Sequence, residues 1–250
     1  IFQNIIKELP VCSINHHGGA ITTSTSGDIY FVTGDSYTAE SYFCEFENSG
    51  SIFKYVYDSR NFYENILCNV ISIFPSLNFI FDISCGHNVE KIGTNIRNSF
   101  GLAVDPKTEY LWQTENGPDR FDEINLVIPK FNSGWLKKYD NFTTYDSGSY
   151  KFSEPEFAWE RTIGPTGIEF ASISTGFTKY DDYLFVGDYN NGNVYKFLLN
   201  QNRDGFIFTD EILLDNEITV DRKKYAGDPE YFLKKNSQSE QILFIKGISG

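Results

Sequence analysis

The sequence is poor in positive charge. Lysine and arginine together contribute 21 residues against 34 aspartates and glutamates, so the 250-residue chain has a net charge of −13. Nucleic-acid binding requires a basic surface, because contacts to phosphates dominate the affinity. The short clusters Lys137-Lys138 and Arg222-Lys223-Lys224 are typical of solvated surface rather than of an anion site. We therefore expect an acidic surface and no nucleic-acid partner.

Long apolar runs are also missing. A stretch such as Val70 to Ile83 is interrupted by Ser, Pro, Asn and Asp, so it falls short of the roughly 20 apolar residues that cross a bilayer. Cysteine is scarce, and Cys12, Cys44, Cys68 and Cys85 show no CxxC spacing. We therefore predict no membrane span in this chain and no zinc site, and the sequence leaves all three possible disulfide pairings open.

Apolar stripes with helical periodicity are scarce, whereas aromatic residues are abundant. The chain holds 23 Phe and 16 Tyr, and Gly, Asn, Asp and Ser interrupt its short apolar runs. This composition predicts an all-β protein built from many short strands.

A loose repeat runs through these strands. Each unit contains an apolar opening, a turn, a strand with a polar end, a second turn containing glycine, and another strand. The units cover residues 19–35 with 50–58, 101–117 with 123–128, and 166–174 with 183–188 and 192–199. Repeated small sheets favour propeller blades, although the unequal spacing of the units leaves a β-sandwich open. The segments at 36–48 and 137–156 read as loops.

A histidine and an aspartate flank the first repeat unit. His16 stands before one predicted strand, and Asp35 follows the next. If these strands pair, the two side chains meet at one end of a sheet. A histidine held by a carboxylate is suited to act as a general base near neutral pH.

An acidic turn lies between two apolar runs in the second unit. The Gly117-Pro118 turn is followed by Asp122 and Glu123. Backbone carbonyls and carboxylates are the oxygen ligands that Ca²⁺ prefers. Calcium is therefore the first cofactor to expect here.

Five segments together resemble the glucose/sorbosone dehydrogenase family, which includes soluble quinoprotein glucose dehydrogenase and the aldose sugar dehydrogenases. They occur in the family's order between Asn15 and Phe197. The segments read HHGGAITTSTSGDIYFVTGD, RNSFGLAVDP, ENGPDRFDEINLV with NSGW, FAWERTIGPTGIEF, and YLFVGDYNNGNVYKF.

The resemblance implies a six-bladed β-propeller. About four blades are represented, so we expect residues 1–250 to form a single propeller domain that lacks blade material at both ends. It also implies oxidation of an aldose by hydride transfer to pyrroloquinoline quinone, with Ca²⁺ as second cofactor. The substrate is then a small sugar, the final electron acceptor is left open, and the location is outside the cytoplasm.

The resemblance further assigns roles to single residues. His16 takes the place of the general base, and Asp35 that of the carboxylate which orients it. Arg97, with a catalytic role, and Asn98 match the pair that contacts the quinone, where a guanidinium stabilises charge developing on the reduced carbonyl oxygen.

The remaining assignments concern the cofactor and metal. Asn116 and Asn190 fall at cofactor-binding positions. Gly117 and Pro118 match the positions whose carbonyls hold the bridging Ca²⁺. Asp122 and Glu123 are expected to serve a structural calcium or to brace the loop.

Three departures from the family pattern weaken the expected cofactor clamp. Asn190 replaces a lysine, Phe100 replaces a glutamine, and Ser99 replaces a proline. A trianionic ligand then loses one compensating cation, which carries a desolvation cost.

Two other functions stay open at this point. A non-catalytic propeller could bind a glycan or a protein through its tyrosine-rich loops. A calcium-dependent hydrolase similar to the gluconolactonase propellers could use a metal to activate water. Lactone hydrolysis without quinone would distinguish the hydrolase.

Overall fold

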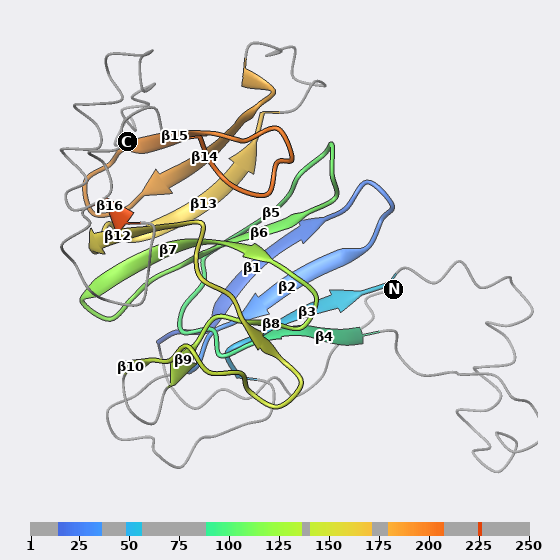
Figure 1. Ribbon diagram of the computed structural model, residues 1–250, viewed down its shortest axis with the longest axis vertical. Helices are drawn as coiled ribbons and strands as arrows, with labels where there is room; N and C mark the ends of the chain where they lie inside the picture. Colours follow the sequence, from blue (N-terminus) through green and yellow to red (C-terminus); the bar gives the residue numbers. More distant parts are fainter. Residues whose placement is uncertain are drawn as a thin grey trace, which may run out of the picture.

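All named elements are β-strands in the part of the chain that the structure describes. This computed structural model describes residues 15–36, 49–56, 89–136, 141–171, 180–207 and 225–226. Strands β1 to β16 form four sheets, as predicted for an all-β protein (Figure 1). No helix in these ranges is long and apolar enough to cross a bilayer. The four cysteines lie outside the described residues.

The first sheet begins as an antiparallel meander. Its order is β1-β2-β3-β4-β8-β11, with β8 parallel to both of its neighbours. Its strands are β1 (Gly18–Thr23), β2 (Ile29–Thr33), β3 (Ser51–Tyr55), β4 (Val89–Thr94), β8 (Phe131–Asn132) and β11 (Lys151–Phe152).

The second sheet follows the order β16-β12-β7-β6-β5, and all pairs except β12–β16 are antiparallel. Its strands are β5 (Gly101–Val104), β6 (Leu111–Glu115), β7 (Arg120–Val127), β12 (Phe157–Arg161) and β16 (Tyr225–Ala226).

The third sheet is an antiparallel meander of β13 (Pro165–Phe170), β14 (Tyr183–Asp188) and β15 (Val194–Leu198). A two-stranded ribbon pairs β9 (Trp135–Leu136) with β10 (Asn141–Phe142). The predicted loop at 137–156 therefore contains two short strands, β10 and β11. Strands of two residues are too short to show the alternation that would reveal them in sequence.

Each predicted repeat unit folds into one three-stranded meander. The units correspond to β1-β2-β3, β5-β6-β7 and β13-β14-β15. On β14 and β15 every second residue is buried, because successive side chains of a strand point to opposite faces. The repeat prediction is confirmed, and the prediction of about four blades also concerns residues outside the described ranges.

The second sheet is covered on both faces. On β5, Ala103 joins the apolar cluster shared with the third sheet, whereas Leu102 and Val104 join the cluster shared with the first sheet. On β6, Trp112 and Leu111 divide in the same way. Strand β5 contacts both β1 and β13, so the opening strands of the three meanders lie side by side. The loops at the ends of these strands carry the candidate site.

Candidate functional site

His16 and Asp35 meet at one end of the first sheet. Strands β1 and β2 pair antiparallel, which brings the segment that leads into β1 next to the segment that follows β2. His16 Nδ1 lies 2.8 Å from Asp35 Oδ1, and Asp35 is only 3% exposed. A carboxylate can only accept, so Nδ1 carries the proton and the ring's lone pair resides on Nε2. That tautomer is the one a general base needs.

Gly34 permits this close arrangement. A Cβ atom at Gly34 would lie 2.0 Å from the carbonyl oxygen of His16, which no real side chain tolerates. His16 itself adopts a left-handed backbone with φ of 56°. The amide of Ser36 donates to the same His16 carbonyl at 3.1 Å. The segment before β1 is thus fastened against the end of β2.

Trp135 joins the histidine–aspartate pair to Arg97. Its indole Nε1–H donates to Asp35 Oδ2 at 2.6 Å, and the Arg97 guanidinium lies 5.2 Å from the centre of its ring. Trp135 is 2% exposed. Sequence reasoning assigned no role to this residue, although it ends the NSGW segment. The sequence offered one signal for such a role, since the N–H of a tryptophan that becomes buried usually has a hydrogen-bond partner.

Arg97 connects three loops. Its carbonyl accepts from the Asp35 amide at 2.8 Å, which ties it to the end of β2. Its Nη1 donates to the carbonyls of Asn116 and Gly117 at 2.9 and 2.8 Å. Its own amide donates to Glu115 Oε1 at 2.7 Å. The guanidinium is therefore held against the carbonyl groups of the Asn116-Gly117 turn.

Glu115 and Glu123 are buried opposite each other on β6 and β7. They are Cα partners, and both are fully buried. Glu115 Oε2 accepts from Gln113 Nε2 at 3.2 Å and from Ser133 Oγ, and Glu123 Oε2 accepts from Asn125 Nδ2 at 3.3 Å. Two carboxylates taken out of water need compensation by hydrogen bonds or a cation. The sequence analysis did not single out Glu115.

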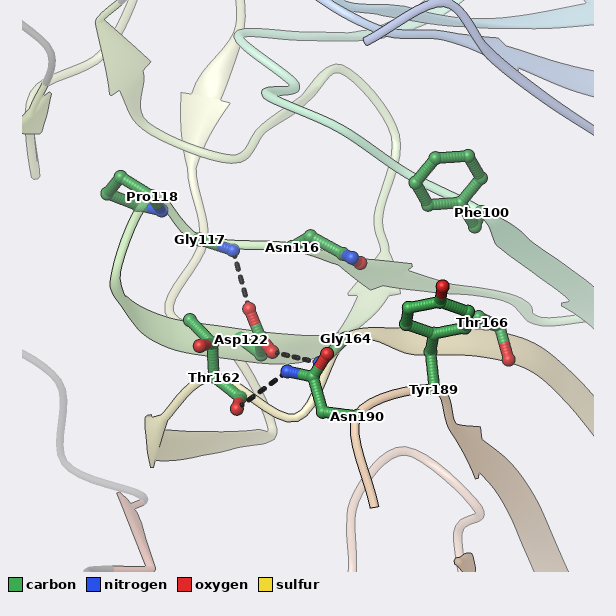
Figure 2. Close-up of a pocket in the computed structure, with 10 residues that line it drawn as sticks. All are labelled: Phe100, Asn116, Gly117, Pro118, Asp122, Thr162, Gly164, Thr166, Tyr189 and Asn190. Atoms are coloured by element: carbon green, nitrogen blue, oxygen red, sulfur yellow. Dashed lines mark hydrogen bonds between the residues drawn. The ribbon is translucent and has the colours of Figure 1, made fainter. Parts of the chain in front are cut away.

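Asp122 braces the turn from below. Its Oδ1 accepts from the Gly117 amide at 2.7 Å, and its Oδ2 accepts from the amides of Ile163 and Gly164 at 2.6 and 2.8 Å. Figure 2 shows the carboxylate between Gly117 and Gly164. Burial raises the pKa of Asp122 to about 6, against the lowering effect of these three backbone hydrogen bonds. Three backbone donors bond to this carboxylate, and these bonds support the predicted bracing role of Asp122.

A pocket of about 420 Å³ opens above this brace, between the loops of the second and third sheets (Figure 2). It is lined by Phe100, Asn116, Gly117, Pro118, Asp122, Thr162, Gly164, Thr166, Tyr189 and Asn190. Asn190 is part of the wall, because its Nδ2 donates to the Thr162 carbonyl at 3.0 Å. These ten described residues include no lysine, arginine or histidine.

The predicted site residues thus form two connected groups. His16, Asp35 and Arg97 belong to the network through Trp135, while Asn116, Gly117, Pro118, Asp122 and Asn190 line the pocket. Arg97 links the groups through the Gly117 carbonyl. Asn98 joins them through its carbonyl, which accepts from the Asn116 amide at 2.8 Å. Within the described residues, no group of three or more His, Cys, Asp or Glu side chains is arranged to hold a metal.

Comparisons with known proteins identify sugar dehydrogenases. A family model described as Glucose / Sorbosone dehydrogenase matches residues 1–222. Aldose sugar dehydrogenase YliI of Escherichia coli (strain K12) is 29% identical over 136 residues, which is 50% of this chain and 36% of that protein. The chain therefore spans about a third of the length of this curated relative.

Two solved structures show the same fold. The PQQ-bound form of aldose sugar dehydrogenase from Streptomyces coelicolor is 22% identical, with a TM-score of 0.51 over 78% of this chain and 48% of that chain. The soluble aldose sugar dehydrogenase from Escherichia coli in the apo-form is also 22% identical, with a TM-score of 0.54 over 83% of this chain and 59% of that chain. The predicted fold class is confirmed by this likeness.

Proposed function

Because the chain belongs to the Glucose / Sorbosone dehydrogenase family, we propose that the protein oxidises aldose sugars with pyrroloquinoline quinone and Ca²⁺ as cofactors. The hydrogen bond between His16 and Asp35 is the observation that carries this proposal. A location outside the cytoplasm, which rests on the resemblance alone, belongs to the same proposal.

His16 is the proposed general base. With its proton held on Nδ1 by Asp35, the Nε2 atom takes the proton of the sugar's C1 hydroxyl while the C1 hydrogen leaves as hydride, so that the aldose becomes a lactone. Asp35 then stabilises the imidazolium that forms. Trp135 acts as a positioning residue, because it donates to the second oxygen of that carboxylate.

The residues around the pocket fit the quinone in part. When bound, pyrroloquinoline quinone supplies a two-electron acceptor for the hydride from C1. Arg97 would stabilise negative charge from behind the Asn116-Gly117 turn. The side-chain oxygens of Asn98 and Asn116 are buried and have no hydrogen-bond partner among the described residues, which supports a ligand or water at this place.

Main-chain oxygens of the turn would hold the cofactor-bound Ca²⁺. Gly117 and Pro118 line the pocket, and a carbonyl oxygen has two lone pairs, so the bond from Arg97 to the Gly117 carbonyl leaves a second acceptor site. Bound there, the ion would act as a Lewis acid.

Glu123 is the residue of the acidic pair that we propose for a structural calcium. It lies opposite Glu115, and the Gln113 Oε1 and Asn125 Oδ1 atoms on the same strands are buried without a hydrogen-bond partner among the described residues. Buried carboxylate and amide oxygens together are the donor set that Ca²⁺ prefers.

The proposal is tested by titrating the protein with the quinone in Ca²⁺ and then measuring dye reduction with a panel of aldoses. We expect His16→Ala to lower kcat by about 10²- to 10⁴-fold. His17→Ala is the matched control, because His17 is exposed and adjacent but outside the network. Equal turnover of both variants would remove His16 as the base. Glycan binding by a protein that binds no quinone would favour the non-catalytic alternative.

A further inference from the structure

The pocket contains exposed aromatic rings where a charged ligand would require cations. Asp122 is the only carboxylate among its lining residues, and it is committed to backbone donors. With no basic side chain among these lining residues, a ligand carrying several carboxylates gains little ionic stabilisation from these walls. Another kind of contact must contribute the affinity.

Phe100 and Tyr189 are suited to supply that contact. Tyr189 is 80% exposed and Phe100 is 46% exposed, although both line the pocket. They come from different sheets, since Phe100 precedes β5 and Tyr189 follows β14. Figure 2 shows both rings on the same side of the pocket, opposite Pro118. When a ligand covers a large aromatic ring that was exposed to water, the burial of apolar surface stabilises the complex.

The backbones beneath both rings are fixed. The Tyr189 amide donates to the Gly164 carbonyl, and the Asn190 amide donates to the Ile163 carbonyl, each at 3.0 Å. Phe100 stands between buried Ser99 and the first residue of β5. Only the side chains must be ordered when a ligand arrives, which keeps the entropic cost of binding small.

We propose that Phe100 and Tyr189 hold the planar conjugated ring system of the cofactor by stacking, so that this protein recognises the ring rather than its charges. This inference rests on the proposed function, because it takes the quinone as the ligand. It predicts binding that depends strongly on the two rings and weakly on ionic strength.

The test is a titration with pyrroloquinoline quinone at fixed Ca²⁺, in which binding is measured by calorimetry and by quenching of tryptophan fluorescence. We expect Phe100→Ala and Tyr189→Ala each to weaken binding about tenfold, and Tyr189→Phe to bind as the unmodified protein does. Tyr145→Ala is the matched control, because Tyr145 is 79% exposed and lies outside the pocket lining. Affinity should change little between about 50 mM and 500 mM salt.

Asn190→Lys separates the inference from the proposed function. A cation on this wall should strengthen quinone binding and make it sensitive to salt. If Asn190→Lys binds more tightly while both alanine variants bind like the unmodified protein, the stacking inference is wrong and the cofactor assignment stands. If neither the unmodified protein nor Asn190→Lys binds the quinone, the proposed function fails and the inference with it. Glucose binding that needs Tyr189 but no quinone would show that the pocket holds the sugar, which also overturns the inference.

Discussion

Asp35 shows how one side chain can serve two partners. Its two oxygens accept from His16 Nδ1 and from Trp135 Nε1, at 2.8 and 2.6 Å. Hydrogen bonds to a charged acceptor are about twice as strong as neutral ones, and in a buried position they also fix orientation. Trp135 therefore helps to orient His16 indirectly, by holding the Asp35 carboxylate to which the histidine donates.

Replacing Trp135 by phenylalanine isolates this hydrogen bond. We expect Trp135→Phe to lower the free energy of unfolding by about 1.5–3 kcal/mol beyond the loss of ring volume, because a buried carboxylate loses a donor. Trp112→Phe is the matched control: Trp112 is fully buried, and its Nε1 has no hydrogen-bond partner among the described residues. Urea denaturation of both variants measures the difference. Equal losses would show that the Trp135 N–H contributes nothing.

Asp122 should make stability depend on pH in an unusual direction. Its pKa is raised from 3.8 to about 6 by burial, so the folded state holds this proton more tightly than the unfolded state. The stabilisation from this group is complete below about pH 4, declines as pH rises toward 6 and is lost above it. We expect Asp122→Asn to remove this part of the slope. Denaturation midpoints of both proteins across that range provide the measurement, and parallel curves would contradict the prediction.

At the scale of elements, a buried ion pair joins the second and third sheets. Arg203, in the turn after β15, donates through Nε and Nη2 to both oxygens of Asp105, at 2.5 and 2.9 Å. Asp105 directly follows β5 and is fully buried. The planar fork of the guanidinium matches a carboxylate in a way that an ammonium group cannot. The pair therefore keeps these two connecting segments in register.

Arg203→Lys should consequently be costly although it preserves charge. We expect a loss of about 2 kcal/mol in the free energy of unfolding, because breaking a buried pair leaves its partner poorly compensated. Lys151→Ala tests an exposed pair with Asp146, whose side chains are 64% and 48% exposed, and should leave the denaturation midpoint unchanged. A harmless Arg203→Lys would mean that the bidentate geometry does not matter.

At the scale of the whole molecule, adjoining sheets cover each other's faces. The middle sheet shares one apolar cluster with each neighbouring sheet, so both of its faces are covered. The site loops lie at strand ends, where the backbone is not needed for sheet pairing. A ligand that binds to these loops can thus stabilise several sheets together.

Calcium should raise the thermal stability of the molecule through Glu123. A ligand that binds only the folded state adds about 2.7 kcal/mol at one hundred times its Kd. We expect Ca²⁺ to increase Tm, and Glu123→Gln to abolish most of the increase. Glu156→Gln is the control, since Glu156 is also buried but accepts from the Leu126 amide. This variant should lower Tm and still respond to Ca²⁺. An unchanged response in Glu123→Gln would exclude Glu123 as a ligand.

Much of the fold and part of the site could be predicted from local patterns. The three repeat units correspond to three meanders. His16 and Asp35 lie together because antiparallel pairing of β1 with β2 brings the segments at their ends to the same edge of the sheet. Trp135 and Glu115 were missed, because their partners lie in other loops. The short strands β10 and β11 were missed because they are defined by pairing with β9 and β8, and a two-residue strand shows no alternation of its own.

The sequence by itself determined the strands, their repeat and the chemical types at each strand end, because side-chain alternation and turn residues act over a few positions. Only the tertiary structure decided which ends meet. Asp35 and Trp135 are 100 residues apart, and Asp122 reaches Ile163 across 41 residues. Such contacts depend on how whole sheets pack, and the packing of apolar faces is non-directional, so no local pattern specifies them.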